Sequence, residues 1–444
     1  MTFHSIFTRP PRALVAAVLA VGVLTGVSAA PAAATTIQRV VSPGGIEAWL
    51  VEEHTVPLIA LNFAFKGGSS QDPDGKEGVA NLVSTLMDEG AGDMTGQQFQ
   101  TALDDISAEM SFEDGRDRFY GQMKMMAETK DKAFDLLALS LNKPRFDADA
   151  IERMRRQAIA GARRELKDPD AVAGHLFGRT VFGNHPYGRL SSGSEQSIQA
   201  ITADDVRSFH RNTFARDGLK VAVVGAIDAK TLAPLLDKLF AGLPDKGSLK
   251  EVPEAKLALG ATVADTMAIP QATVRFGTEG LKRRDADFQA AYVMNHILGG
   301  GTFSSWLYTE VREKRGLAYT ISTGLAPFEH AGLFVGGVGT RADKVGETIG
   351  IIKEQLKRMA EQGPTQEELD KAKEYIIGSY ALRFDTSDKI AGQLLAIQID
   401  DLGIDYIDKR NDQISAVTLA DVKRVAKRIL SNPVTFVTVG PSAS

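Results

Sequence analysis

Apolar residues between Gly78 and Glu89 recur with the spacing of an α-helix. They follow one another at i, i+3, i+4, i+7 and i+8, which places them on one helix face. These residues are Val79, Leu82, Val83, Leu86 and Met87. The opposite face carries the polar residues Asn81, Ser84, Thr85 and Asp88. The pattern predicts a helix over 78–89 with a buried apolar face and a polar face available for chemistry.

Short apolar segments in the two halves of the chain have the length and alternation of β-strands. Pro57–Lys66 is matched by Pro270–Gly277, and Val221–Gly225 is matched by Phe436–Gly440. Offsets of about 213 to 218 residues also relate Ile201–Arg207 to Val417–Lys423 and Asp147–Ile159 to Thr365–Ile377. A repeat this long indicates two similar domains, because the repeats of solenoids are much shorter.

The order of strands and helices in each half predicts an α+β fold. We expect two homologous domains, each a mainly antiparallel sheet with helices on one face, which together form half of a clam-shell chamber. Their expected spans are residues 35–242 and 261–444, joined by a linker at 243–260 in which Pro244, Gly247 and Pro253 interrupt the periodicity. A single large domain is the alternative, and the repeat argues against it.

Residues 1–34 have the composition of a secretory signal peptide. Arg9 and Arg12 precede the apolar stretch Ala13–Val27, and a run of small residues ends at Ala34. We expect cleavage near Ala34 and a periplasmic or secreted mature chain without a membrane span. An uncleaved anchor is the alternative, although the apolar stretch is short for the roughly 20 residues that a span requires.

Composition excludes several classes of protein. The chain of 444 residues is 43% hydrophobic and 24% charged, which is typical of a globular protein. It contains no cysteine, so it has no disulfides, thiolate metal ligands or cysteine nucleophile. Its formal net charge of -5 is spread along the sequence without a basic patch, and nucleic acid is therefore not an expected partner.

The segments Phe65–Ser69 and Gly78–Ala80 resemble the pitrilysin/insulinase family of zinc metallopeptidases just before its inverted zinc motif, H-x-x-E-H. In that motif two histidines bind zinc from one helix face, and the glutamate activates the bound water. The resemblance places the two histidines at Asn81 and Thr85 and the glutamate at Ser84. None of these residues supplies an imidazole or a carboxylate, so the resemblance implies a degenerate zinc site.

The family has a further glutamate downstream that completes the metal shell. The surroundings Asn184–Arg189 also resemble the family, and the spacing places this ligand at Ala162, with Glu165 three residues beyond. One carboxylate without the histidines does not make a zinc site. None of the seven histidines lies within five residues of another, so only a site assembled from distant residues remains as an alternative. We expect no cofactor in this chain and zinc in a partner subunit.

The second half carries the stronger resemblance. Gly299, Gly300 and Gly301 resemble the family's glycine-rich loop, and Arg312 and Tyr319 its R-x(6)-Y pair. The resemblance implies that the tyrosine donates a hydrogen bond to the developing oxyanion and that the arginine holds the substrate.

Local chemistry fits a helix between the loop and the tyrosine. Ser304 can cap the start of a helix that ends near Arg315, and Gly316 can take the left-handed conformation that ends it. The chain then enters a strand over Leu317–Thr323.

Simpler interpretations of these residues remain. The charged run 310–315 is typical of a solvated helix face, Tyr319 of strand packing, and the three glycines of a tight turn. A phosphate-binding loop is excluded because no Lys-Ser/Thr follows the glycines.

The sequence therefore predicts the non-catalytic subunit of a heterodimeric insulinase-like metalloendopeptidase. It would be inactive alone and would act with a homologous zinc-bearing subunit that carries H-x-x-E-H on unfolded peptide substrates. The alternative is a metal-free peptide-binding or structural subunit, including a homodimer. A self-sufficient metalloprotease is disfavoured because the ligands are missing.

Overall fold

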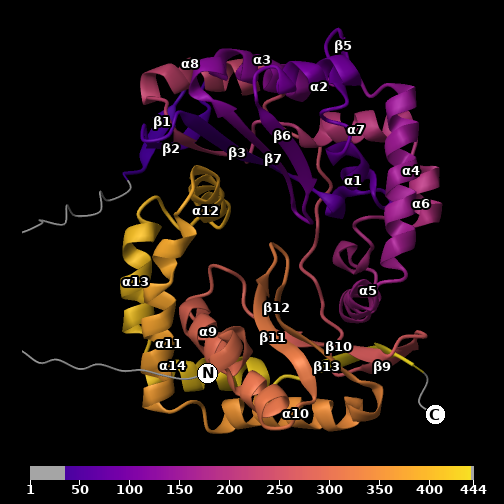
Figure 1. Ribbon diagram of the computed structural model, residues 1–444, viewed down its shortest axis with the longest axis vertical. Helices are drawn as coiled ribbons and strands as arrows, with labels where there is room; N and C mark the ends of the chain where they lie inside the picture. Colours follow the sequence, from indigo (N-terminus) through magenta and orange to yellow (C-terminus); the bar gives the residue numbers. More distant parts are fainter. Residues whose placement is uncertain (1–35, 442–444) are drawn as a thin grey trace, which may run out of the picture. The chain divides into compact units, whose positions relative to one another are not determined.

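The computed structural model describes residues 36–441, of which residues 37–441 belong to one compact unit (Figure 1). The expected signal peptide at 1–34 lies outside the described residues. None of the helices in the described part is long and apolar enough to cross a membrane.

The first half forms a six-stranded sheet in the order β1-β2-β8-β3-β7-β6. Its strands are β1 Gln38–Val41, β2 Glu47–Glu52, β3 Leu58–Lys66, β6 Glu109–Asp114, β7 Arg118–Met126 and β8 Lys220–Gly225. Its helices are α1 Val79–Ser84, α2 Gly96–Asp104, α3 Lys130–Asn142, α4 Ala148–Glu165, α5 Pro169–Phe182, α6 Glu195–Ala200, α7 Ala203–Thr213 and α8 Ala229–Phe240. A two-stranded ribbon, β4 Gly90–Ala91 with β5 Met94–Thr95, precedes α2.

The second half forms a five-stranded sheet in the order β11-β12-β10-β13-β9. Its strands are β9 Thr262–Thr266, β10 Gln271–Glu279, β11 Ala318–Pro327, β12 Gly332–Arg341 and β13 Thr435–Gly440. Its helices are α9 Phe288–Asn295, α10 Val345–Glu361, α11 Gln366–Gly378, α12 Ser387–Ile399, α13 Tyr406–Ala416 and α14 Leu419–Leu430. The expected linker, 243–260, falls between α8 and β9.

The two sheets share one topology, which confirms the predicted α+β fold of two homologous domains. The order β6-β7-β3-β8-β2 corresponds strand by strand to β11-β12-β10-β13-β9, and in each sheet only the pair that ends this series is parallel. Packing repeats as well. A Cβ on Gly121 would come within 2.1 Å of the Phe63 ring, and one on Gly336 within 2.2 Å of the Phe276 ring. Each half therefore has a glycine that admits a phenylalanine from the neighbouring strand.

Strand alternation divides the side chains of β3 between two cores. Ile59, Leu61 and Phe63 pack in the core of the first half, beneath its own helices. Ala60 and Ala64 face the opposite side and pack with residues of α12, which belongs to the second half. Each sheet thus carries its own helices on one face, as expected, and a helix from the other half on the other face.

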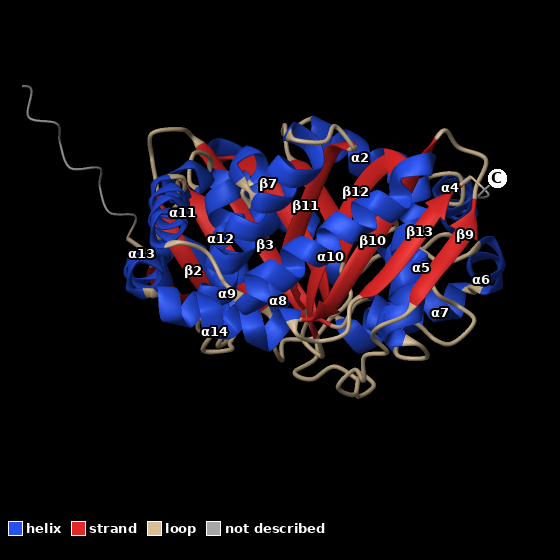
Figure 2. Cartoon of the chain, turned by 90° about the horizontal axis from the view of Figure 1, so that it is seen from below, coloured by secondary structure: helices blue, strands red, loops and turns tan. Residues whose placement is uncertain are grey.

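The exchange of helices is reciprocal. α12 packs on β3 and β8 of the first half, and α5 packs on β10 and β13 of the second, as both views show (Figures 1 and 2). α5 and α12 occupy the same place in the element order of their halves. Burial of the second face of each sheet therefore depends on the other half being folded.

Tyr187 ties the two halves together where their hairpins meet. Its side chain is 1% exposed, and its hydroxyl donates to Asp117 Oδ2 at 2.6 Å. The hydroxyl oxygen of Tyr187 also accepts the His330 backbone N–H at 3.1 Å. A hydroxyl that bonds to residues of both hairpins fixes their relative position.

Two predicted helices differ in detail from the expectation. The segment 78–89 is α-helical only over Val79–Ser84 and continues as turns. The segment after the glycine-rich loop is mainly a π-helix, Tyr308–Glu313. Gly316 ends it with φ of +60°, as expected. Ser304 instead donates its hydroxyl to the Gly301 carbonyl, so the prediction that it caps this helix is wrong.

The helix exchange predicts a stability effect. Leu394 of α12 is fully buried against the sheet of the first half, and Leu394→Ala should lower the free energy of unfolding by about 2–5 kcal/mol, measured by urea denaturation. The matched control Leu382→Ala removes a side chain that is 72% exposed, and it should change stability by less than about 0.5 kcal/mol. Equal effects of the two substitutions would contradict the reciprocal packing.

Candidate functional site

The start of α1 is held by a buried carboxylate. Gly78 precedes the helix with φ of +96°, and Asp72 accepts the backbone N–H groups of Gly78 at 2.8 Å and Ala80 at 2.9 Å. Burial raises the pKa of Asp72 to about 7 although both N–H donors favour its charged form. Asp72 therefore fixes the position of the helix that carries the degenerate zinc residues.

The side chains at the degenerate positions all bond to nearby protein groups. Asn81 Nδ2 donates to Asp114 Oδ1 on β6 at 2.9 Å. The hydroxyl of Ser84 donates to the Asn81 carbonyl at 2.8 Å, and that of Thr85 to the Leu82 carbonyl at 2.9 Å. Both hydroxyls thus bond within their own helical turn, which is common for such residues in helices.

The position of the family's downstream glutamate also lacks a zinc ligand. Ala162 is buried in α4 and has no polar side chain. Glu165 accepts a hydrogen bond from the Ser192 hydroxyl at 2.7 Å, and His175 Nε2 lies 3.9 Å from its carboxylate. Ser192 donates to the carboxylate, so these three side chains do not form a nucleophile–base relay, in which the hydroxyl would bond to the imidazole.

These residues do not fit a zinc ion. An amide, two hydroxyls committed to backbone carbonyls and an alanine lack the imidazole and carboxylate donors that zinc sites use. Within residues 36–441, no three His, Asp or Glu side chains are grouped as metal ligands. The hydrogen bond from Asn81 to Asp114 instead joins α1 to the edge strand β6.

The same connection recurs in the second half. Asn295, at the end of α9, accepts a hydrogen bond from the Thr323 hydroxyl of β11 at 2.8 Å. Asn295 and Asn81 lie at equivalent places, since α9 corresponds to α1 and β11 to β6. Asn81 therefore makes the structural bond that both domains use between their first helix and their edge strand. The repeat offset relates the two asparagines, but interpreting Asn81 as a replaced zinc ligand did not reveal their common role.

The glycine-rich loop packs tightly against this second asparagine. A Cβ on Gly299 would lie 2.5 Å from Thr323 Oγ1, and one on Gly300 would lie 2.4 Å from Asn295 Nδ2. Gly299 and Gly300 end a π-helix over His296–Gly300. Glycine is required here because any side chain would displace the hydrogen bond between Asn295 and Thr323.

Arg312 lies between two aromatic rings. Its guanidinium carbon is 4.8 Å from the centroid of the Tyr308 ring and 5.0 Å from that of the Tyr319 ring. Both distances lie within the range of cation–π attraction. The register of β11 shifts between Ala318 and Ile321, so Tyr319 sits in a bulge, a feature that redirects side chains beside active sites.

Of the two rings that contact Arg312, one is buried and the other is exposed. Tyr308 is 2% exposed, whereas Tyr319 is 80% exposed, and its hydroxyl has no hydrogen-bond partner among the described residues. Phe303 is 69% exposed and packs edge-on against Tyr308. We call Phe303, Tyr308, Arg312 and Tyr319 the arginine–aromatic cluster. Sequence reasoning found Arg312 and Tyr319 but missed the two other members, which have no distinguishing pattern.

The charged run divides into two parts. Glu310 forms ion pairs with Lys314 and Arg315, and the hydrogen bonds from Lys314 and then Arg315 lower the pKa of its carboxyl. Lys314 and Arg315 lie on a solvated helix face and pair with the mostly buried carboxylate of Glu310. Arg312 forms no ion pair among the described residues and is held by aromatic rings. A solvated helix face therefore explains Lys314 and Arg315 and their pairing with Glu310, but it does not explain Arg312.

The buried carboxyl of Asp114 predicts a pH dependence of stability. Burial raises the pKa of Asp114 to about 6, above the ordinary value near 3.9 in an unfolded chain. Its contribution to stability is then complete below about pH 4 and is lost as the pH rises through about 6. The stability of the wild type relative to Asp114→Asn should therefore fall over this interval, as measured by urea midpoints. Exposed Asp412→Asn should show no such change, and a pH-independent difference for Asp114→Asn would refute the prediction.

Known proteins resemble the chain over nearly its whole length. A family model described as Insulinase (Peptidase family M16) matches residues 49–190, and one described as Peptidase M16 inactive domain matches residues 200–376. An uncharacterized zinc protease of Streptomyces coelicolor is 26% identical, covering 91% of this chain and 90% of that protein. The non-peptidase homolog YmxG of Helicobacter pylori is 27% identical, covering 76% of this chain and 78% of that protein.

Solved structures agree with these matches. The crystal structure of a peptidase M16 inactive domain from Pseudomonas fluorescens has a TM-score of 0.86 and 27% identity, covering 92% of this chain and 99% of that one. A protease from Helicobacter pylori shares the fold, with a TM-score of 0.82 and 21% identity. The chain therefore belongs to the insulinase family, peptidase family M16, and within it to the inactive members.

Proposed function

We propose that this chain is the non-catalytic subunit of a heterodimeric M16 metallopeptidase, periplasmic or secreted, and that it supplies Arg312 and Tyr319 to the zinc site of a homologous partner. The observation that carries the proposal is the arginine–aromatic cluster. The Arg312 guanidinium contacts the Tyr308 and Tyr319 rings, and the exposed Tyr319 hydroxyl has no partner in the described part of the chain. Asn81, Ser84 and Thr85 replace the zinc motif and bond to protein groups. In this proposal, peptide hydrolysis therefore requires a second chain that binds zinc.

The geometry suits transition-state binding. The Tyr319 hydroxyl can donate a hydrogen bond to the oxyanion that develops on a scissile carbonyl. Stacking against Tyr308 limits the motion of Arg312, so less side-chain entropy is lost when its free N–H groups bind substrate carbonyls. The partner would supply zinc and the glutamate that activates water.

The first half offers a place to hold extended peptide. β6 pairs only with β7 among the described strands, so its outer edge has free backbone groups. Such an edge can accept a peptide as an added strand. The backbone bonds of an added strand recognise unfolded chain of many sequences, which agrees with unfolded peptides as substrates.

The test combines purified mature chain with a candidate zinc-bearing partner. The chain alone should contain no stoichiometric zinc and cleave no peptide, whereas the mixture should show chelator-sensitive cleavage of a quenched fluorogenic peptide. Tyr319→Phe removes the hydroxyl and retains the ring, and it should lower kcat roughly 10²–10³-fold without dissolving the complex. Arg312→Ala should also lower kcat/KM.

Arg315→Ala is the matched control. Arg315 lies three residues from Arg312, is exposed and, among residues 36–441, bonds only to Glu310, so its loss should leave turnover unchanged. Size-exclusion chromatography checks that every variant still forms the complex. Zinc-dependent cleavage by the lone chain, or full activity of Tyr319→Phe, would refute the proposed roles.

A metal-free peptide-binding subunit is the second candidate function. The free edge of β6 favours it, since this edge can hold peptide without any partner. This candidate would be supported if the chain binds unfolded peptides while no M16 partner restores cleavage.

A further inference from the structure

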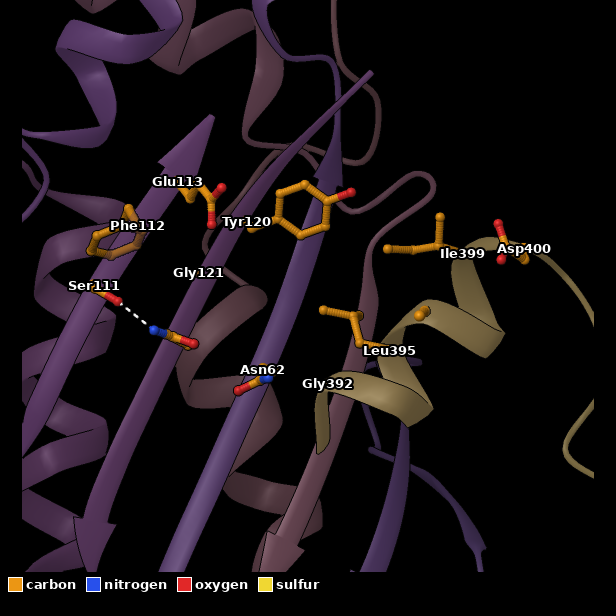
Figure 3. Close-up of a pocket in the computed structure, with 12 residues that line it drawn as sticks. Asn62, Ser111, Phe112, Glu113, Tyr120, Gly121, Gly392, Leu395, Ile399 and Asp400 are labelled. Atoms are coloured by element: carbon orange, nitrogen blue, oxygen red, sulfur yellow. Dashed lines mark hydrogen bonds between the residues drawn. The ribbon is translucent and has the colours of Figure 1, made fainter. Parts of the chain in front are cut away.

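A cavity of about 530 Å³ lies between the sheet of the first half and α12 of the second (Figure 3). Its walls come from β3, β6 and β7 on one side and from α12 on the other. α12 contacts β3 and β8, so it covers the centre of the sheet and leaves the face at β6 and β7 open. The cavity therefore adjoins the free edge of β6.

The wall that α12 contributes to the cavity is mainly apolar. Figure 3 shows Leu395 and Ile399 pointing from α12 toward the ring of Tyr120 on β7. Gly392 on the helix contributes no side chain, which leaves room between α12 and the sheet. Such a space suits a long aliphatic or aromatic side chain.

The unbalanced charge at the cavity is negative. Asp400 lies 3.4 Å from Arg283, and the charges of Arg283, Arg118 and Arg284 together balance its carboxylate. Arg118, next along β7 on the same face, donates to the Gly218 carbonyl and lies 4.0 Å from Glu329. Glu113, on β6 beside Tyr120, forms no ion pair within the described residues. A cation that enters the cavity therefore meets a free carboxylate at its mouth.

The register of β6 directs a bound peptide toward this carboxylate. Residues i and i+2 of a strand face the same side, so Ser111 and Glu113 both face the cavity, which they line. Alternate residues of a peptide added to β6 would point to the same side. Glu109, also on this face, is opposite Lys124 on β7, whereas Glu113 is opposite Tyr120. Glu113 is thus the acidic residue of this face without a cross-strand cation.

We propose that the cavity is a subsite for a basic side chain, arginine or lysine, of an extended peptide paired with β6. The aliphatic stem packs against Tyr120, Leu395 and Ile399, and the charged head reaches Glu113 and the amide oxygen of Gln122. The inference rests on the peptide-binding part of the proposed function and names the substrate class: unfolded peptides that carry a basic residue.

The experiment measures binding of labelled peptides to the purified mature chain by fluorescence anisotropy. Each peptide is a decapeptide of uncharged residues except for a single lysine. The position of this lysine differs from one peptide of the series to the next. Norleucine, which keeps the stem without the charge, and glutamate replace the lysine in parallel series. At one position lysine should bind about fivefold tighter than norleucine, with glutamate weakest, and added salt should reduce the difference.

Glu113→Gln should abolish the preference for lysine over norleucine and leave the affinity for the norleucine peptide unchanged. Glu109→Gln is the matched control, on the same strand and face but outside the cavity, and it should retain the preference. Gly392→Leu fills the cavity, since a Cβ there meets only Asn62 Nδ2 at 3.8 Å, and it should weaken both peptides together. Circular dichroism and urea midpoints verify that each variant is folded.

Equal affinities for lysine and norleucine at every position would overturn the subsite and leave the helper role standing. An unchanged preference for lysine in Glu113→Gln would also overturn the subsite. Binding of the peptides by Gly392→Leu with the affinity of the wild type would overturn it as well. Lysine-selective binding with no cleavage in the presence of a zinc-bearing partner would instead refute the helper role and retain the subsite. Absence of any peptide binding would overturn the subsite as well.

Discussion

The reciprocal exchange of α5 and α12 is the constraint on which the rest of the structure depends. Each sheet has apolar side chains on both faces, and its own helices cover only one of them. The second face is buried only when the corresponding helix of the other half packs on it, so the hydrophobic effect links the folding of the two halves. The same packing creates the cavity beside β6, because its outer wall is α12.

The hydrogen bonds of α1 show how the first domain holds its first helix in place where the residues of the family's zinc motif are replaced. In a zinc site the metal joins ligands from separate elements and contributes to stability. Here Asp72 holds the helix start and Asn81 bonds to Asp114 on the edge strand. The second half makes the equivalent bond between Asn295 and Thr323. An asparagine on the first helix is therefore a structural device common to both domains.

The second half keeps features that stability alone does not require. Close packing explains the glycines, since Gly299 and Gly300 approach Thr323 and Asn295 and Gly301 approaches His296. Exposing most of the Tyr319 ring gains little from burial, and two π-helical turns with a bulge at Tyr319 depart from regular geometry. π-Helical turns and bulges are frequent at functional sites. They bring Arg312 and Tyr319 together although seven positions separate them.

The sequence by itself determined the duplication, the α+β class, the family and the loss of the zinc residues. Each of these depends on residue types at fixed spacing, such as Asn81, Ser84 and Thr85 on one short helix. Tertiary structure alone decided the exchange of helices, the stacking of Arg312 between Tyr308 and Tyr319, and the bond from Asn81 to Asp114. It also decided that Glu113, rather than Glu109, faces a cavity without a neighbouring cation. These are contacts between segments far apart in the chain or at irregular turns, and local periodicity carries no information about which distant surfaces meet.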